Sequence, residues 1–150
     1  MKKLTIILWL YTICVASFAQ KEITWYTLSD VKWKMEYIKS MKNFYQMPRF
    51  GKNLLALDST EVSVKGFYIP VKADGSLSVV SAKPSSACFF CGTGGIESVI
   101  EIVAAANTLR FRHLKTDKYI KVSGTLKLNK TDPEHLMYIL ENAKLLEIID

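Results

Sequence analysis

The sequence predicts a mostly β protein, a small five-stranded barrel preceded by an aromatic-rich N-terminal extension. Two observations lead to this fold class. Apolar and polar residues alternate along several segments after residue 57, which is the period of half-buried strands. Two of the longest segments carry a glycine in the middle, at Gly66 and Gly124. A glycine lets a strand bend or coil, as closing a sheet into a barrel requires.

The first nineteen residues have the features of an export signal. Lys2 and Lys3 precede an apolar run from Leu4 to Val15, and Ala19 ends a stretch of small residues suited to a signal peptidase. The apolar run is shorter than the ~20 residues that a membrane-spanning helix needs. We therefore expect cleavage near Ala19, a mature chain without a transmembrane span, and a periplasmic or secreted location.

A single domain remains after residues 1–19. The mature segment has 131 residues (150 − 19), the size of one ordinary domain. Its lysines are spaced singly, and removal of Lys2 and Lys3 lowers the formal charge from +6 to +4. This pattern favours an ordinary solvated surface and argues against nucleic acid as a partner. We divide the mature segment into an extension, residues 20–56, packed on a barrel, residues 57–150.

The extension is dense in aromatic residues. Trp25 to Leu28 suits a short strand or a turn. Val31 to Tyr37 alternates as a strand does, whereas the apolar spacing from Met35 to Tyr45 suits a helix, so both alternatives stay open. Aromatic residues usually pack in cores or at sheet edges, and we assign that role rather than ligand stacking. They are Trp25, Tyr26, Trp33, Tyr37, Phe44, Tyr45 and Phe50.

The first two barrel strands are expected on either side of a hairpin. Residues 61–70 alternate cleanly, with a slip at Gly66 that would turn Phe67 and Ile69 inward. The pair Asp74-Gly75 predicts a tight turn into a return strand at 77–81.

Three further strands complete the predicted barrel. Residues 98–105 are rich in β-branched side chains, which favours a strand over a buried helix. Residues 119–128 form a strand bent at Gly124, and the chain ends in strand segments at 138–140 and 143–149. The Val-Xaa-Gly pattern in the first and fourth strands resembles the oligonucleotide/oligosaccharide-binding (OB) barrel. A β-sandwich is the alternative.

Cys88 and Cys91 form a CxxC pair between the second and third predicted strands. In an oxidising compartment such a pair serves as a local disulfide, a redox pair or half of a metal site. A redox pair needs its first cysteine at a helix N-terminus, and the glycines between Gly92 and Gly95 argue against a helix there. Haem attachment would need a histidine directly after the second cysteine, where Gly92 stands.

A zinc site would need about two ligands besides the cysteines. His113 lies 22 residues after Cys91 and 22 before His135, a spacing that matches no standard zinc finger. The candidate metal ligands are Cys88, Cys91 and His113, with a Cys88–Cys91 disulfide as the alternative. We expect His113 to be nearer the cysteines than His135, because the connection after the third strand can return to the same end of the barrel.

Four motifs follow one another along the chain. They are Val62-Ser63-Val64-Lys65-Gly66, Cys88-Phe89-Phe90-Cys91-Gly92, Gly124-Thr125-Leu126-Lys127-Leu128-Asn129 and His135 to Leu140. Their order resembles that of a known family. Residues 23–148 are similar to exported bacterial proteins known as a "domain of unknown function" family, in the form common among Bacteroidetes. After the cysteines this chain reads Gly-Thr-Gly-Gly-Ile where that family has Gly-Gly-Ala-Gly-Pro. The resemblance implies export and one β-rich domain, and it implies no activity.

The sequence therefore predicts an exported, non-catalytic binding or accessory module of the cell envelope. Its partner would be an envelope protein, a small ligand or a metal ion, and its CxxC connection would act as a local disulfide or a partial metal site, with zinc as the candidate cofactor. The first alternative is a periplasmic metal-handling protein that uses Cys88 and Cys91 with a histidine. The second is a thiol-disulfide redox protein. No Ser-His-Asp or paired-carboxylate spacing stands out, which argues against an enzyme.

Overall fold

The structure is a computed structural model that describes residues 20–39, 41–72, 77–87, 95–105, 109–132 and 134–149. The predicted export signal and the pair Cys88 and Cys91 lie outside the described residues. Within these ranges, no helix has the length and apolar character needed to cross a membrane.

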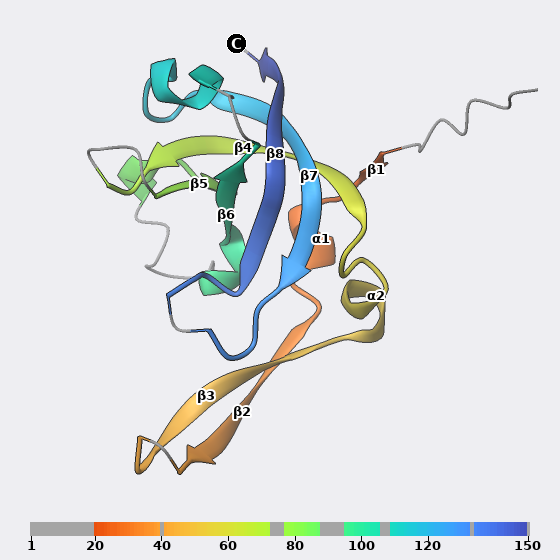
Figure 1. The fold of residues 1–150 in the computed structure, drawn as a ribbon, viewed down its shortest axis with the longest axis vertical. Coiled ribbons are helices and arrows are strands. Elements are labelled where there is room, and N and C mark those ends of the chain that lie inside the picture. Colours follow the sequence, from red (N-terminus) through yellow and green to blue (C-terminus); the bar gives the residue numbers. More distant parts are fainter. Residues whose placement is uncertain are drawn as a thin grey trace, which may run out of the picture.

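Strands dominate the described chain, so the mostly β prediction is confirmed (Figure 1). The helices are single turns. In chain order the elements are β1 (Lys21–Glu22), α1 (Trp25–Leu28), β2 (Val31–Ile38), β3 (Asn43–Phe50), α2 (Lys52–Leu55), β4 (Glu61–Pro70), β5 (Ser78–Ser81), η1 (Ser85–Ala87), η2 (Ile96–Ser98), β6 (Val99–Ala104), η3 (Leu109–His113), β7 (Tyr119–Leu128) and β8 (Tyr138–Ile149), where η marks a 3₁₀ helix.

Among the described residues, six strands form one sheet, and part of that sheet closes into a ring. β4 pairs with β5, β5 with β6, β6 with β8 and β8 with β7, and β7 pairs back with β4. These pairs are antiparallel except for β6 and β8, which run in the same direction. β4 closes the ring because its first part, Glu61 to Phe67, pairs with β7 and its last part, Phe67 to Pro70, pairs with β5. β1 adds to β4 in parallel.

Gly66 marks a close approach within the ring and leaves the register unbroken. Val62, Val64 and Tyr68 all belong to the main core, so the alternation of β4 continues through the glycine. The predicted slip is therefore wrong, and Ile69 belongs to a second, smaller cluster instead. A glycine is needed at residue 66 because the neighbouring atoms leave no room for a side chain. A Cβ at Gly66 would lie 2.5 Å from Val80 Cγ1, 2.6 Å from the Ser81 carbonyl oxygen and 2.9 Å from the Trp25 ring.

Gly124 faces a bulge on the neighbouring strand. The register of β7 and β8 shifts between Ser123 and Thr125, and Asn142 on β8 has a φ of 52°. A Cβ at Gly124 would lie 2.6 Å from the Glu141 carbonyl oxygen. This shift, one of two in the pair, thus comes from an extra residue on β8, and Gly124 provides the space for it.

Two short helices bring the extension into the core of the ring. Residues 25–28 form α1, so the expected strand or turn is wrong at this point. A single helical turn is too short to show a period, and Thr24 caps it by accepting a hydrogen bond from Thr27 N. Leu28 on α1 and Leu54 on α2 are fully buried. Tyr138 Oη on β8 donates a buried hydrogen bond of 2.6 Å to the Leu28 carbonyl oxygen.

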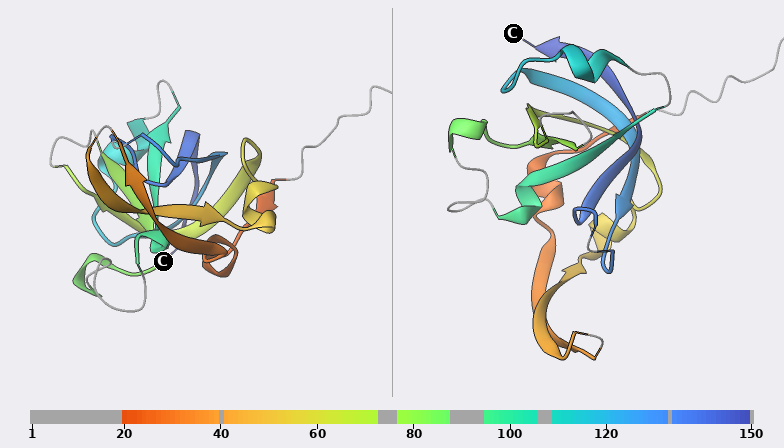
Figure 2. Two further views of the ribbon diagram at one scale, coloured as in Figure 1. Left: turned by 90° about the horizontal axis from the view of Figure 1, so that it is seen from below. Right: turned by 60° about the vertical axis from the view of Figure 1, so that its left-hand side comes forward.

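Residues 31–50 form a separate two-stranded ribbon, which we call the arm. β2 and β3 pair without a register shift from Val31 opposite Phe50 to Ile38 opposite Asn43, so the helix alternative for this segment is wrong. Figures 1 and 2 agree that the arm extends away from the ring. Only its base is buried, at Pro48 and Phe50.

Gly66→Ala is expected to lower the free energy of unfolding by about 1–3 kcal/mol, because its methyl group would meet backbone and a fully buried valine. Denaturant unfolding measures the change. Gly95→Ala is the matched control, since the added methyl meets only the carboxylate end of Glu97, which can rotate away, and its effect should stay within about 0.5 kcal/mol. An equal effect of both substitutions would contradict the close approach at Gly66.

Candidate functional site

The connection that carries the CxxC pair is described at its two ends. Ala82 N donates to the Ser98 carbonyl oxygen at 3.0 Å, which joins the two ends to each other. Ser85 donates through its backbone N and its Oγ to the two carboxylate oxygens of Asp117, both at 2.6 Å. The connection is thus fixed to the segment that precedes β7. Disulfide formation and metal ligation by Cys88 and Cys91 stay predictions.

His135 contacts the strand that follows the CxxC connection. Its Nδ1 lies 2.7 Å from Glu101 Oε1, and the backbone N of Leu136 donates to Glu101 Oε2 at 2.9 Å. Glu101 lies two residues into β6 and is only 5% exposed. Asn129 braces the same β7–β8 connection by donating to the Asp132 carbonyl oxygen at 2.7 Å. A buried carboxylate is thereby supplied with two hydrogen-bonding partners.

The Glu101 carboxylate raises the pKa of His135 above its ordinary value of 6.5, first through the hydrogen bond and then through its charge. Asp132 adds to the rise, and Lys127 opposes it. The imidazole is 42% exposed, so solvent reaches this ion pair.

His113 follows β6 in the chain, whereas the CxxC connection precedes it. His113 ends η3, which follows the carboxyl end of β6, whereas the CxxC connection leads into the amino end of that strand. Because Cys88 and Cys91 lie outside the described residues, the expectation that His113 is nearer to them than His135 stays a prediction. Within the described ranges, no three His, Cys, Asp or Glu side chains are grouped so that they could hold a metal ion. Zinc ligation by Cys88, Cys91 and His113 stays a prediction.

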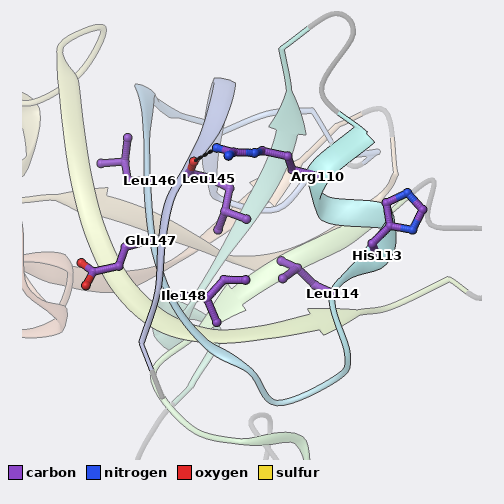
Figure 3. A pocket seen from close by; sticks show the side chains of 7 residues that line it. All are labelled: Arg110, His113, Leu114, Leu145, Leu146, Glu147 and Ile148. Carbon is purple, nitrogen blue, oxygen red and sulfur yellow. Dashed lines mark hydrogen bonds between the residues drawn. The ribbon is translucent and has the colours of Figure 1, made fainter.

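His113 borders a shallow pocket of about 450 Å³ between η3 and the end of β8. Figure 3 shows Arg110 extending from η3 toward β8 and His113 at the outer side of η3. The apolar side chains of Leu114 and, from β8, of Leu145 and Ile148 face the space between these two elements. Arg110 Nη1 donates to the Leu145 carbonyl oxygen at 3.3 Å. One nitrogen of the guanidinium is therefore already hydrogen-bonded within the protein.

The arm carries a large exposed apolar surface. The packing role that the sequence suggested for its aromatic residues is wrong for most of them, because no segment among the described residues covers them. Toward the tip, Met35 is 56% exposed, Tyr37 52%, Met41 52% and Phe44 59%. Trp33 and Tyr45 are both 39% exposed. Exposed apolar groups gathered on one element usually mark an interaction site.

The two faces of the arm differ in chemistry. The cross-strand pairs place Trp33, Met35 and Tyr37 with Phe44 on one face. The basic residues of the strands lie on the other face, and Lys39 and Lys42 lie at the turn. That second face holds Lys32, Lys34 and Arg49 together with Ile38, Tyr45 and Met47.

The arm is also basic. Residues 31–50 hold five basic side chains and one carboxylate, a formal charge of +4 (5 − 1). Glu36 pairs with Arg49, so the lysines have no acidic partner among the described residues. This cluster was not predicted from the sequence, because the lysines are spaced singly along the chain. The alternation from Val31 to Tyr37 contained the signal, because a strand there sends aromatic residues and lysines to opposite faces.

The chain matches no protein-family model and no curated protein. Among solved structures it is similar to a DUF3299 family protein from Pseudomonas aeruginosa PAO1, with a TM-score of 0.52 and 16% sequence identity. The match covers 88% of this chain and 99% of that chain. At this identity the similarity shows the fold alone. It agrees with the coarser part of the resemblance noted from the sequence, a likeness to a family named as a domain of unknown function.

The His135–Glu101 pair predicts a pH dependence of stability. Because the folded pKa of His135 is raised, its contribution is fully present below the ordinary value of 6.5 and is lost as pH rises through the folded value. The difference in unfolding free energy between the wild type and His135→Gln should therefore shrink as pH rises from the ordinary value of 6.5 through the raised pKa of the folded state. His113→Gln, which leaves the pair intact, is the control. A difference that grows with pH would contradict the pairing.

Proposed function

We propose that the protein is an exported, non-catalytic binding module of the cell envelope that contacts its partner through the arm. The observation that carries this proposal is the set of exposed apolar side chains on a ribbon whose base alone is buried. A soluble fold gains nothing from holding four such side chains more than half exposed, whereas a binding surface requires them.

The ring serves as the platform for this arm. We interpret residues 57–150 as an OB-like barrel and residues 20–56 as the extension that supplies the arm. The OB fold is a five-stranded Greek-key barrel, and the ring order β4–β5–β6–β8–β7, closed by β4 and β7, supports this interpretation. The export signal at residues 1–19 and the resemblance to exported Bacteroidetes proteins with a Cys-Phe-Phe-Cys-Gly motif support a place in the periplasm or outside the cell.

The CxxC connection has a local role in this proposal. We assign Cys88 and Cys91 to a disulfide that stiffens the connection between β5 and β6, whose two ends are already held by Ser85, Asp117 and Ser98. Metal handling is the second candidate, because a carboxylate and a histidine, Glu101 and His135, lie together on the strand and connection next to it. A thiol-disulfide redox role ranks third.

Removing the apolar side chains of the arm should release the protein from the envelope. Cells that express the whole chain are separated into envelope and soluble periplasmic fractions, and each fraction is probed for the protein. We expect the wild type in the envelope fraction and Tyr37→Ser/Phe44→Ser in the soluble fraction, because both side chains are more than half exposed and serve no packing in the core.

Tyr26→Ser is the matched control for that experiment. Tyr26 is 88% exposed but lies on α1, outside the arm, so its loss should leave the distribution unchanged. Envelope association that survives the double substitution, or that Tyr26→Ser abolishes equally, would contradict a binding role for the arm.

The oxidation state of the cysteines separates the disulfide from the metal site. Protein purified from the periplasm without reductant is expected to resist alkylation at Cys88 and Cys91 and to have the mass of a form that lacks two hydrogens. Elemental analysis of the same sample should find no zinc in stoichiometric amount. Alkylatable thiols together with one bound zinc, lost in Cys88→Ser and His135→Gln, would favour metal handling instead.

A further inference from the structure

We infer that the partner of the arm is a membrane surface rich in anionic phospholipid, into which the tip of the ribbon inserts. This inference rests on the proposed function, since it names the partner of the same surface. The contacts, the charges and the shape of the arm each bear on it.

The shape of the tip excludes a small-molecule site. Binding pockets for small ligands are concave, whereas the arm is a protruding two-stranded ribbon (Figure 2). A protruding element must enter its partner. The partner is therefore a bilayer or a macromolecule with a groove.

The tip has the composition of an element that sits at a membrane interface. Tyr37 and Phe44 lie directly opposite each other in the register, and their rings meet edge to face with centroids 5.2 Å apart. Met35 and Met41 extend the apolar surface on either side of this pair. Aromatic rings of this kind are favoured at the level of lipid headgroups, where their faces contact acyl chains.

The lysines surround this apolar group. Lys34 lies on the face opposite Met35 and Tyr37, and Lys39 and Lys42 lie at the turn beyond them. A lysine can keep its stem along apolar surface while its ammonium group reaches the headgroups. The tip therefore presents only apolar and neutral groups on one face, lysine beside Ile38 and Tyr45 on the opposite face, and two further lysines at the end.

This distribution favours a bilayer over an acidic protein. A protein groove that contacts the face of Trp33 and Tyr37 would leave the other face, with its lysines and Tyr45, in water. A bilayer surrounds an inserted tip on every side, so all four lysines can reach lipid phosphates. A second copy of the chain is disfavoured because two arms of charge +4 repel each other, and lysines on exposed strands oppose strand-to-strand pairing.

Vesicle binding by the purified protein tests the inference. One set of vesicles contains phosphatidylcholine and phosphatidylglycerol at about 7:3, and the other contains phosphatidylcholine alone. We expect sedimentation with the anionic vesicles, at least about tenfold weaker binding to the neutral ones, and weakening by salt. The fluorescence of Trp33 should shift to shorter wavelength only with anionic vesicles, because Trp33 is partly exposed on the aromatic face.

Two variants separate charge from insertion. Lys34→Gln/Lys39→Gln/Lys42→Gln should weaken binding roughly a hundredfold, since each lysine near an anionic surface contributes about fivefold. Its matched control is Lys72→Gln/Lys115→Gln/Lys144→Gln, which removes the same charge from exposed positions outside the arm and should bind within about threefold of the wild type. Tyr37→Ser/Phe44→Ser should abolish the shift of Trp33. All variants share the wild-type N-terminus, so differences between them report on the arm.

Three results would overturn the lipid surface as partner. They are equal binding to both kinds of vesicle, equal weakening by the two lysine triples, and absence of vesicle binding. If vesicle binding is absent while the envelope association still depends on Tyr37 and Phe44, the partner is an acidic envelope protein and the proposed function stands. If the protein does not bind vesicles and its envelope association does not depend on Tyr37 and Phe44, the proposed function fails together with the inference.

Discussion

The pairing of β4 with β7 is the constraint on which the rest of the structure depends. It joins residues 61–67 to residues 119–125 and turns an open sheet into a ring. The core lies inside that ring, and Val62, Val64, Ile120 and Val122, all fully buried, come from these two strands. Without this pairing, the apolar face of each strand would lose the opposite side of the core, where most of the hydrophobic stabilisation arises.

The same pairing creates a local conflict of charge that β1 resolves. Lys65 and Lys121 are directly opposite each other in the register, and like charges at such positions are destabilising. Glu22 on β1 accepts from Lys65 at 3.0 Å and from Lys121 at 2.6 Å. These lysines lower the pKa of Glu22, which keeps the carboxylate charged between them. The first strand after residue 20 therefore covers the outer side of the seam that closes the ring.

The ring also explains how the arm can expose so much apolar surface. An isolated two-stranded ribbon is at best marginally stable in water. Here its base is held by Phe50, whose ring lies 5.9 Å from that of the buried Tyr138 and 5.6 Å from Lys130 Nζ. Tyr138 in turn is tied to α1 through Leu28. The stability of the ribbon thus comes from its anchored end, which leaves the side chains of the tip free for a partner.

Much of the fold could be predicted from period alone. The alternation in residues 61–70 and 119–128 corresponds to β4 and β7, because each has one face in the core. The one-turn helices α1 and α2 were missed, since four residues cannot display a helical period. The alternation of inward and outward side chains after Gly66 was predicted wrongly. A glycine that makes room for a neighbouring carbonyl oxygen and a glycine that makes a bulge look the same in sequence.

The candidate site was harder to predict than the fold. Sequence shows that Trp33, Met35, Tyr37 and Phe44 are apolar, but it does not show whether another layer covers them. That depends on contacts between distant segments. The sequence likewise contains no sign that Glu101 on β6 and His135 in the β7–β8 connection, 34 residues apart, are in contact.

Hydrogen–deuterium exchange resolved by residue tests the central claim most directly. The claim is that a closed ring holds an arm whose tip is the binding element. In the free protein, amides of β4 and β7 should exchange slowly and those at the tip of the arm quickly. On addition of anionic vesicles, protection should rise at residues 35–44 and stay unchanged across the ring. Protection that appears on the ring while the tip exchanges as before would contradict the account.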